Sequence, residues 1–167
     1  MEPAGGTYRV LGIDPGLNIT GYGVVDFGRG EPAIVEAGAI RTNAQASMGE
    51  RIGQIYETLR EILSEFEPDV VGIEKLYAHY RHPRTSILMG HARGVILLAA
   101  GQAGVAVRDL PATRVKKSLT GNGHASKHQM QRAVQDLCGL DEPPHPADVA
   151  DALAIALCAG KILAFSG

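Results

Sequence analysis

Long apolar runs and cysteines are both scarce in this chain of 167 residues. No run approaches the roughly 20 apolar residues that a membrane-spanning helix needs, and the N-terminal stretch MEPAGGTYR has no apolar segment typical of a signal peptide. Two cysteines, Cys138 and Cys158, are too few for a disulfide framework, so we expect reduced thiols in a cytoplasmic protein. A hydrophobic content of 45% favours one domain with a substantial core, preceded by a flexible lead-in over residues 1–7.

Two kinds of binding motif are also missing. The chain has no Walker-type glycine loop, which counts against a nucleotide-dependent phosphotransferase or ATPase. Its histidines include no pair at zinc-ligand spacing with a third ligand nearby, and the segment HASKH at 124–128 is only a weak match. Neither a nucleotide site nor a zinc site is therefore expected.

The net charge of −2 conceals an uneven distribution. Residues 76–135 contain nine Lys and Arg residues against a single acid, Asp109, whereas the segments on either side are both acidic. A basic block with almost no compensating acids favours a polyanionic partner such as nucleic acid. A solvated basic surface would have the same composition and remains the alternative.

Hydrophobic patterning predicts an α/β domain with a mixed sheet of five strands. In chain order the predicted elements are strands at 8–14, 19–27 and 33–42, a helix at 46–66, a strand at 69–74, a helix at 84–104, a strand at 105–110, and helices at 112–119, 126–138 and 146–163. The first three strands are close enough in sequence to pair antiparallel as a meander. Helices between the later strands imply crossovers, so we expect the last two strands to be parallel, with helices flanking the sheet.

Two acids follow apolar strands directly. Asp14 ends the first strand before Pro15 and Gly16, and Glu74 ends the run DVVGI in the same way. Asp before Pro-Gly is common turn chemistry, so Asp14 could simply cap the turn. If the two strands are neighbours in the sheet, however, both carboxylates emerge at the same edge on rigid supports.

The last helix carries two more acids, Asp148 and Asp151, whose spacing of three places them on one face of its first turns. Their position near the helix N-terminus stabilises each by about 0.3–1 kcal/mol, which could be their whole role. Together with Asp14 and Glu74 they would form an oxygen-rich cluster suited to Mg²⁺ or Mn²⁺. Two such ions roughly 3.5–4 Å apart can stabilise phosphoryl displacement and activate a bound water.

Five blocks of the sequence together carry a family resemblance. In order from about residue 8 to residue 163, VLGIDPGLNITGYGVV, VVGIEKLYA, GHARGVIL, TRVKKSLTGNGHASKHQM and HPADVADALAIALC resemble the RuvC-type Holliday-junction resolvases of bacteria. The resemblance implies a single ribonuclease-H-like nuclease domain over residues 1–167. It also implies a homodimeric, Mg²⁺-dependent endonuclease that makes paired, symmetric nicks at four-way DNA junctions in recombination and repair. It further implies two metal ions per site, with Mn²⁺ able to replace Mg²⁺, and a branch-migration complex as a partner.

The resemblance assigns roles residue by residue. The family's catalytic and metal-binding acids fall on Asp14, Glu74, Asp148 and Asp151. Its functionally important lysines fall on Lys116 and Lys127, and its base-stacking aromatic falls on Tyr77, where Phe is more usual. The DNA contacts that we expect come from the aromatic and basic residues of the block, namely Tyr77, Arg81, Arg84, Lys116, Lys117 and Lys127. His91 stands where Gln is usual, and Tyr80 could either stack on bases or pack into the core.

Other interpretations remain open at the level of sequence. The closest is a related metal-dependent nuclease acting on other branched or structured nucleic acids, and a different one is a junction-binding protein without catalysis. A phosphotransferase on the same fold would also end its first strand in D-x-G, but it would need two such domains. The apolar helix at 84–104 could pack across a twofold axis through Gly90, Ala92 and Gly94, or it could be buried within one subunit.

Overall fold

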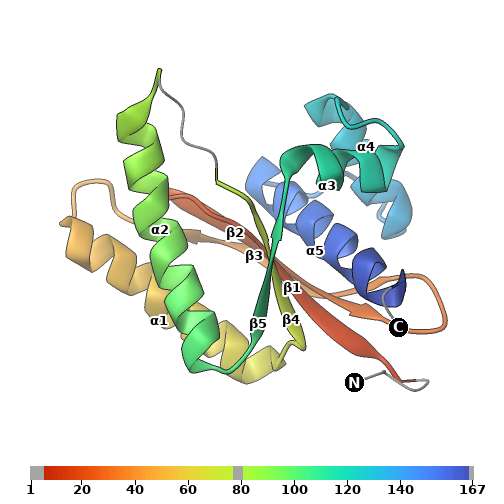
Figure 1. The fold of residues 1–167 in the computed structure, drawn as a ribbon, viewed down its shortest axis with the longest axis horizontal. Helices are drawn as coiled ribbons and strands as arrows, with labels where there is room; N and C mark the ends of the chain where they lie inside the picture. Colours follow the sequence, from red (N-terminus) through yellow and green to blue (C-terminus); the bar gives the residue numbers. More distant parts are fainter. Residues whose placement is uncertain (1–5, 77–80, 166–167) are drawn as a thin grey trace.

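A computed structural model describes residues 6–76 and 81–165 of the protein, with the elements labelled in Figure 1. In chain order these are β1 (Tyr8–Asp14), β2 (Ile19–Phe27), β3 (Ala33–Arg41), α1 (Met48–Phe66), β4 (Val70–Glu74), α2 (Pro83–Gln102), β5 (Ala106–Leu110), α3 (Ala112–Thr120), α4 (Lys127–Leu137) and α5 (Ala147–Phe165). All ten predicted elements are present, and their ends differ from the prediction by a few residues at most. Residues 1–5, most of the expected lead-in, lie outside the described residues.

The predicted mixed sheet is confirmed. Its strand order is β3-β2-β1-β4-β5, with β2 antiparallel to both of its neighbours, β1 and β3. Strand β4 runs parallel to both of its neighbours, β1 and β5. The pairing of β1 with β4 is the one that matters for function, because it places the ends of these two strands side by side.

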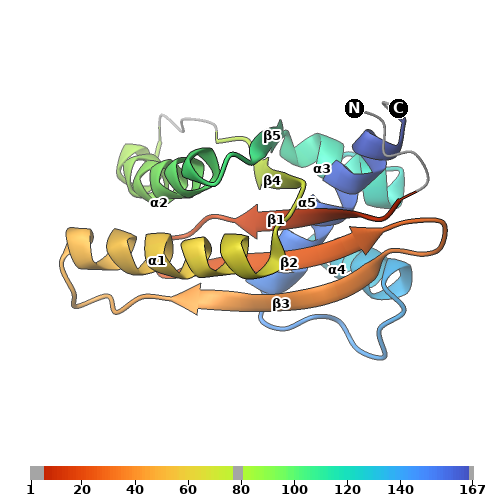
Figure 2. The same cartoon turned by 90° about the horizontal axis from the view of Figure 1, so that it is seen from below.

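Helices cover both faces of the sheet, as Figure 2 shows. Helices α1 and α2 pack on one face around a core that includes Leu11, Ile13 and Ile73. Helix α5 crosses the other face, with α3 and α4 packed against it, around a second core that includes Val10 and Val70. The sheet thus separates two apolar layers, and alternate residues of β1 and β4 face opposite layers.

Three glycines form a row across the sheet beneath α5. Gly12 of β1 pairs with Gly23 of β2 on one side and with Gly72 of β4 on the other. A Cβ atom on Gly12 would lie 2.2 Å from the carbonyl oxygen of Ala152, so only glycine fits there. The row lets the α5 backbone lie almost directly on the sheet, which fixes the position of the helix relative to the strand ends.

Helix α2 has one buried side and one exposed side. Ala92 is fully buried against the core shared with α1, which agrees with the alternative of burial within one subunit. Gly94 is exposed, and so are the large apolar side chains of Ile87 and Leu98, at 61% and 51%. None of the helices in the described ranges is both long and apolar enough to cross a membrane.

Candidate active site

The carboxylates of Asp14 and Glu74 emerge at the same edge of the sheet. The parallel register pairs Ile13 with Ile73, and each of these residues is followed directly by its acid. Because side chains alternate along a strand, both acids face the layer that contains α5. The predicted meeting of the two strand ends is therefore confirmed.

The turn after Asp14 is fixed by a buried threonine. The Thr20 hydroxyl donates a hydrogen bond to the carbonyl of Gly16 over 2.7 Å and accepts one from its N–H over 3.3 Å. Thr20 is fully buried, and a side chain on Gly16 would collide with the carbonyl of Ile19. The residues that follow Asp14 are thereby held against the start of β2.

Helix α5 brings the other two acids to this edge. Asp148 lies in its first turn and Asp151 follows three residues later. Gly21, the β2 partner of Asp14 in the ladder, packs so closely on the helix that a Cβ atom there would lie 2.1 Å from the carbonyl oxygen of Asp148. Contact between the helix start and the strand end thus follows from glycine at this position.

Burial and mutual repulsion perturb the acids strongly. Burial, followed by the negative charges of Asp151, Asp148 and Glu74, raises the pKa of Asp14 from 3.8 to about 8, while Lys127 opposes the rise. Burial also raises the pKa of Asp151, with Lys127 opposing this, Asp148 adding to it and a hydrogen bond with Asp14 offsetting part of it. The acids therefore interact with one another as a single electrostatic cluster.

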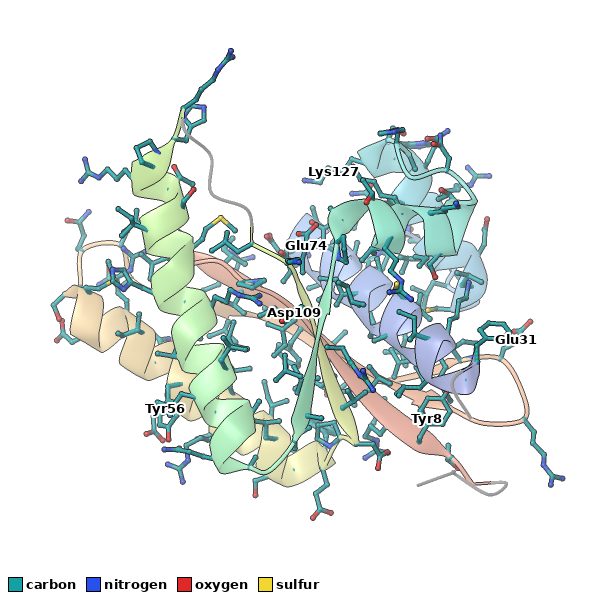
Figure 3. The ribbon with its side chains drawn as sticks, viewed as in Figure 1. Tyr8, Glu31, Tyr56, Glu74, Asp109 and Lys127 are labelled. Atoms are coloured by element: carbon teal, nitrogen blue, oxygen red, sulfur yellow. The ribbon has the colours of Figure 1, made fainter. Side chains whose placement is uncertain are left out.

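Glu74 belongs to the same cluster. Its pKa is raised by burial and by the charge of Asp151, and Lys116 opposes the rise. Glu74, Asp151, Lys116 and Lys127 line an open cavity of about 270 Å³, whose apolar part is formed by residues of α3, α4 and α5. Figure 3 shows Lys127 on the same side of the molecule as Glu74, above the strand end. The two lysines predicted to be functional thus face the acids.

Lys117 does not join this group. It is the neighbour of Lys116 in sequence, but on α3 it faces a separate open cavity of about 810 Å³, together with Arg114 and Lys161. That cavity also includes Tyr8 and Phe165, close to the chain ends and away from the strand end that carries Glu74 (Figure 3). Adjacent residues of an α-helix point about 100° apart, so the helix predicted at 112–119 already separates the two side chains, although it does not predict the cavities that they face.

The remaining predicted DNA contacts lie around the start of α2 or outside the described residues. Arg81 precedes α2 and Arg84 lies in its first turn, and both are exposed. This end of α2 stands across from α3 and α4, with the end of β4 between them (Figure 1). Tyr77 and Tyr80 both lie outside the described residues.

Sequence reasoning missed a partly buried arginine next to the site. Arg93 of α2 donates a hydrogen bond to the backbone carbonyl of Glu74 over 2.9 Å and forms an ion pair with Asp109 of β5. Counted only as part of the basic block, Arg93 looked like a surface charge. The available signal was Asp109, the single acid in that block, because an isolated acid among cations indicates a specific pairing.

The donor set fits a hard divalent cation. All four candidate ligands are carboxylates, the ligand type that Mg²⁺ and Mn²⁺ favour. Within residues 6–76 and 81–165, no group of three or more Asp, Glu, His or Cys side chains is arranged so that it could hold a metal ion as it stands. The acids share one edge and repel one another, as the raised pKa of Asp14 shows, and a cation between them would offset that repulsion.

Comparison with known proteins identifies the family. The sequence profile described as crossover junction endodeoxyribonuclease RuvC matches residues 10–159. The chain belongs to this family. A RuvC family member from Rhodopirellula baltica is 50% identical over 149 residues, which cover 89% of this chain and 84% of that protein. Another, from Caldicellulosiruptor saccharolyticus, is 43% identical over 151 residues and 90% of each chain.

Solved structures of the RuvC family agree with this assignment. The structure of Thermus thermophilus RuvC in complex with a Holliday junction substrate matches with a TM-score of 0.90 and 36% identity, over 95% of this chain and 96% of that one. A yeast mitochondrial Holliday junction resolvase matches with a TM-score of 0.65 at 15% identity, which shows the shared fold alone. The predicted ribonuclease-H-like fold is confirmed, and the family is one of divalent-metal-dependent nucleases.

Proposed function

We propose that this protein resolves four-way DNA junctions by paired, symmetric nicks, using Mg²⁺ at a site formed by Asp14, Glu74, Asp148 and Asp151. The observation that carries the proposal is the meeting of two strand-end carboxylates with the first turns of α5. Further support comes from the similarity of almost the whole chain to a RuvC structure that contains a Holliday junction.

In this mechanism the four carboxylates would hold one or two Mg²⁺ ions, which would supply an activated water and offset negative charge at the scissile phosphate. The acids must be deprotonated to bind a cation, and the raised pKa of Asp14 means that cation binding displaces a proton from the cluster. Lys116 and Lys127, which share a cavity with Glu74 and Asp151, bind phosphate oxygens and orient the strand.

The DNA-binding surface extends from this cavity toward the start of α2. Arg81 and Arg84 are exposed there and can contact the backbone of the same junction arm. Tyr77, in the segment between β4 and α2, is proposed to stack on a base at the crossover. Lys117 contacts DNA only if an arm passes over α3 to its other side, so its contribution is expected to be smaller than that of Lys116.

A homodimer would present two such sites to two equivalent strands. We assign the interface to the outward face of α2, where Ile87, Gly94 and Leu98 form an exposed, mostly apolar stripe. Leu98→Asp is expected to shift the protein to monomers in analytical ultracentrifugation, with unchanged circular dichroism. A dimer that survives this change at micromolar concentration contradicts the assignment.

The proposed activity is tested by mapping nicks on an immobile four-way junction with and without Mg²⁺. We expect paired nicks in two strands of like polarity, and Asp14→Asn should abolish them while junction binding persists. Equal cleavage of flaps or three-way junctions would indicate a nuclease of broader selectivity. Tight, Mg²⁺-independent binding with no nicking would indicate a junction-binding protein without catalysis.

A further inference from the structure

Arg93 connects three elements beneath the candidate site. It comes from the middle of α2, and its side chain is only 15% exposed. One guanidinium nitrogen donates to the carbonyl of Glu74 at the end of β4, and another pairs with the carboxylate of Asp109 on β5. The contact to Glu74 is to its backbone, so it leaves the Glu74 carboxylate free for the site.

The orientation of the peptide group between Glu74 and Lys75 explains why the Glu74 carbonyl needs a donor from Arg93. Its N–H, on Lys75, donates to the carbonyl of Leu110 on β5 over 2.9 Å. A trans peptide group directs its two polar groups to opposite sides, so the Glu74 carbonyl faces away from β5, toward the side of β1. There β1 has ended, and the residue after Asp14 is Pro15, which has no N–H to donate.

Pro15, Glu74 and Arg93 line the same small cavity of about 30 Å³. The guanidinium of Arg93 thus supplies the donor that proline cannot supply, at the point where the β1–β4 ladder stops. A partly buried carbonyl without a donor is unfavourable, and the end of β4 would otherwise be free to shift. Asp109 balances the buried charge of Arg93 and orients its planar group toward both partners.

We propose that Arg93 is a positioning residue for catalysis, which fixes the end of β4 so that the Glu74 carboxylate is directed at the metal site. Asp109 acts through Arg93 and has no contact of its own with the site. The effect of Arg93 on catalysis rests on the proposed function. The effect of Arg93 on cation binding by the acids can be measured without DNA.

The test compares Arg93→Met, Arg93→Lys and Asp109→Asn with the wild-type protein and with Arg60→Met, a control on α1 whose ion pair with Glu57 is exposed. Three quantities are measured at a temperature where all variants are folded: single-turnover cleavage rate, junction affinity in Ca²⁺, and Mn²⁺ affinity by titration calorimetry without DNA. Removal of an outer residue that orients a ligand typically lowers metal affinity or activity about 10–100-fold.

We expect Arg93→Met to lower the cleavage rate and the Mn²⁺ affinity by about 10-fold or more, with junction affinity within about twofold of wild type. Arg93→Lys keeps one donor, and Asp109→Asn keeps the guanidinium, so both should have intermediate effects. Arg60→Met should match wild type in all three measurements.

A merely structural role predicts a different result, in which Arg93→Met lowers the melting temperature but leaves cleavage rate and Mn²⁺ affinity unchanged. That result would overturn the proposal. A wild-type protein that fails to cleave junctions would refute the proposed function instead. In that case the inference on Arg93 is decided by Mn²⁺ affinity alone, with equal affinity in wild type and Arg93→Met refuting it.

Discussion

Replacing Asp14 with Asn should stabilise the metal-free protein at neutral and alkaline pH. The pKa of Asp14 is raised from 3.8 to about 8 in the folded protein, because burial and three neighbouring acids disfavour its charged form. A carboxyl with a raised pKa favours folding fully only below its unfolded pKa. This stability is lost as the pH rises toward the folded pKa of about 8, above which no further loss occurs.

The magnitude follows from the shift. A rise from 3.8 to about 8 spans roughly four pH units, and each unit corresponds to about 1.4 kcal/mol, so the limiting loss is about 5–6 kcal/mol. At pH 7, one unit below the folded pKa, about 4 kcal/mol of this is already lost. Asp151 shares part of the interaction through its hydrogen bond with Asp14, so we expect Asp14→Asn to recover about 2–4 kcal/mol at pH 8.

Urea denaturation in EDTA at half-unit steps from pH 5 to pH 8.5 measures this effect. Groups outside the acidic cluster contribute to wild type and variant alike, so the difference between the two free energies of unfolding reports on Asp14 and the acids coupled to it. That difference should grow with pH in favour of Asp14→Asn and level off above pH 8. Glu61→Gln, a change at an exposed acid of α1, is the matched control for the loss of one carboxylate.

Divalent cations should narrow this difference in stability between wild type and Asp14→Asn. A ligand that binds only the folded state at 100 times its Kd adds about 2.7 kcal/mol to wild type, and less to a variant with a weakened site. Parallel pH curves for wild type and Asp14→Asn in EDTA would refute the reasoning, because they would mean that Asp14 is not held against other buried acids. Equal stabilisation of both proteins by Mg²⁺ would count against the metal site.

Three further predictions concern the supports of the site. Gly12→Ala places a Cβ atom 2.2 Å from the carbonyl of Ala152, so the free energy of unfolding in urea should fall by about 1–3 kcal/mol, the range typical of overpacking; a change below about 0.5 kcal/mol would show that α5 can shift freely. Thr20→Val leaves the polar groups of Gly16 without their buried partner and should lower the free energy of unfolding by about 1–3 kcal/mol; an unchanged value would mean that water replaces the hydroxyl. Lys127→Met removes the cation that lowers the pKa of Asp14 and Asp151, so the acidic limb of the pH–rate profile should move to higher pH. An acidic limb at the same pH in the variant would mean that Lys127 does not interact electrostatically with the acids.

The four acids could be predicted from the sequence because residue type and position agreed. Asp14 and Glu74 each end an apolar strand, and the spacing of Asp148 and Asp151 places them on one face of a helix. The prediction required the first and fourth strands to be neighbours in the sheet. The parallel pairing of Ile13 with Ile73 meets this requirement. The sequence pattern predicted carboxylates as candidate ligands, and the order of strands in the sheet explains why those on β1 and β4 meet.

The supports of the site could not be predicted in the same way. Gly12, Gly23 and Gly72 are far apart in the chain and become a row only when the strand register aligns them. Helical geometry separates Lys116 from Lys117 by about 100°, but the cavity that each side chain faces depends on how α3 packs against distant segments. Both features depend on register and packing between distant segments, which the composition of a single segment does not contain.

The way in which the acids are held leaves their charge available for a cation. None of the three ion pairs among the described residues involves Asp14, Glu74, Asp148 or Asp151. Backbone contacts instead hold the segments that carry them: the glycine row and Gly21 beneath α5, Thr20 at the turn after Asp14, and Arg93 on the carbonyl of Glu74.

An arginine bound directly to one of these carboxylates would relieve the repulsion and compete with a metal ion for the same oxygens. The two lysines of the cavity lower the pKa of the acids from a distance without forming an ion pair with them. Repulsion within the cluster is therefore preserved by the fold, and a divalent cation is the group best able to offset it.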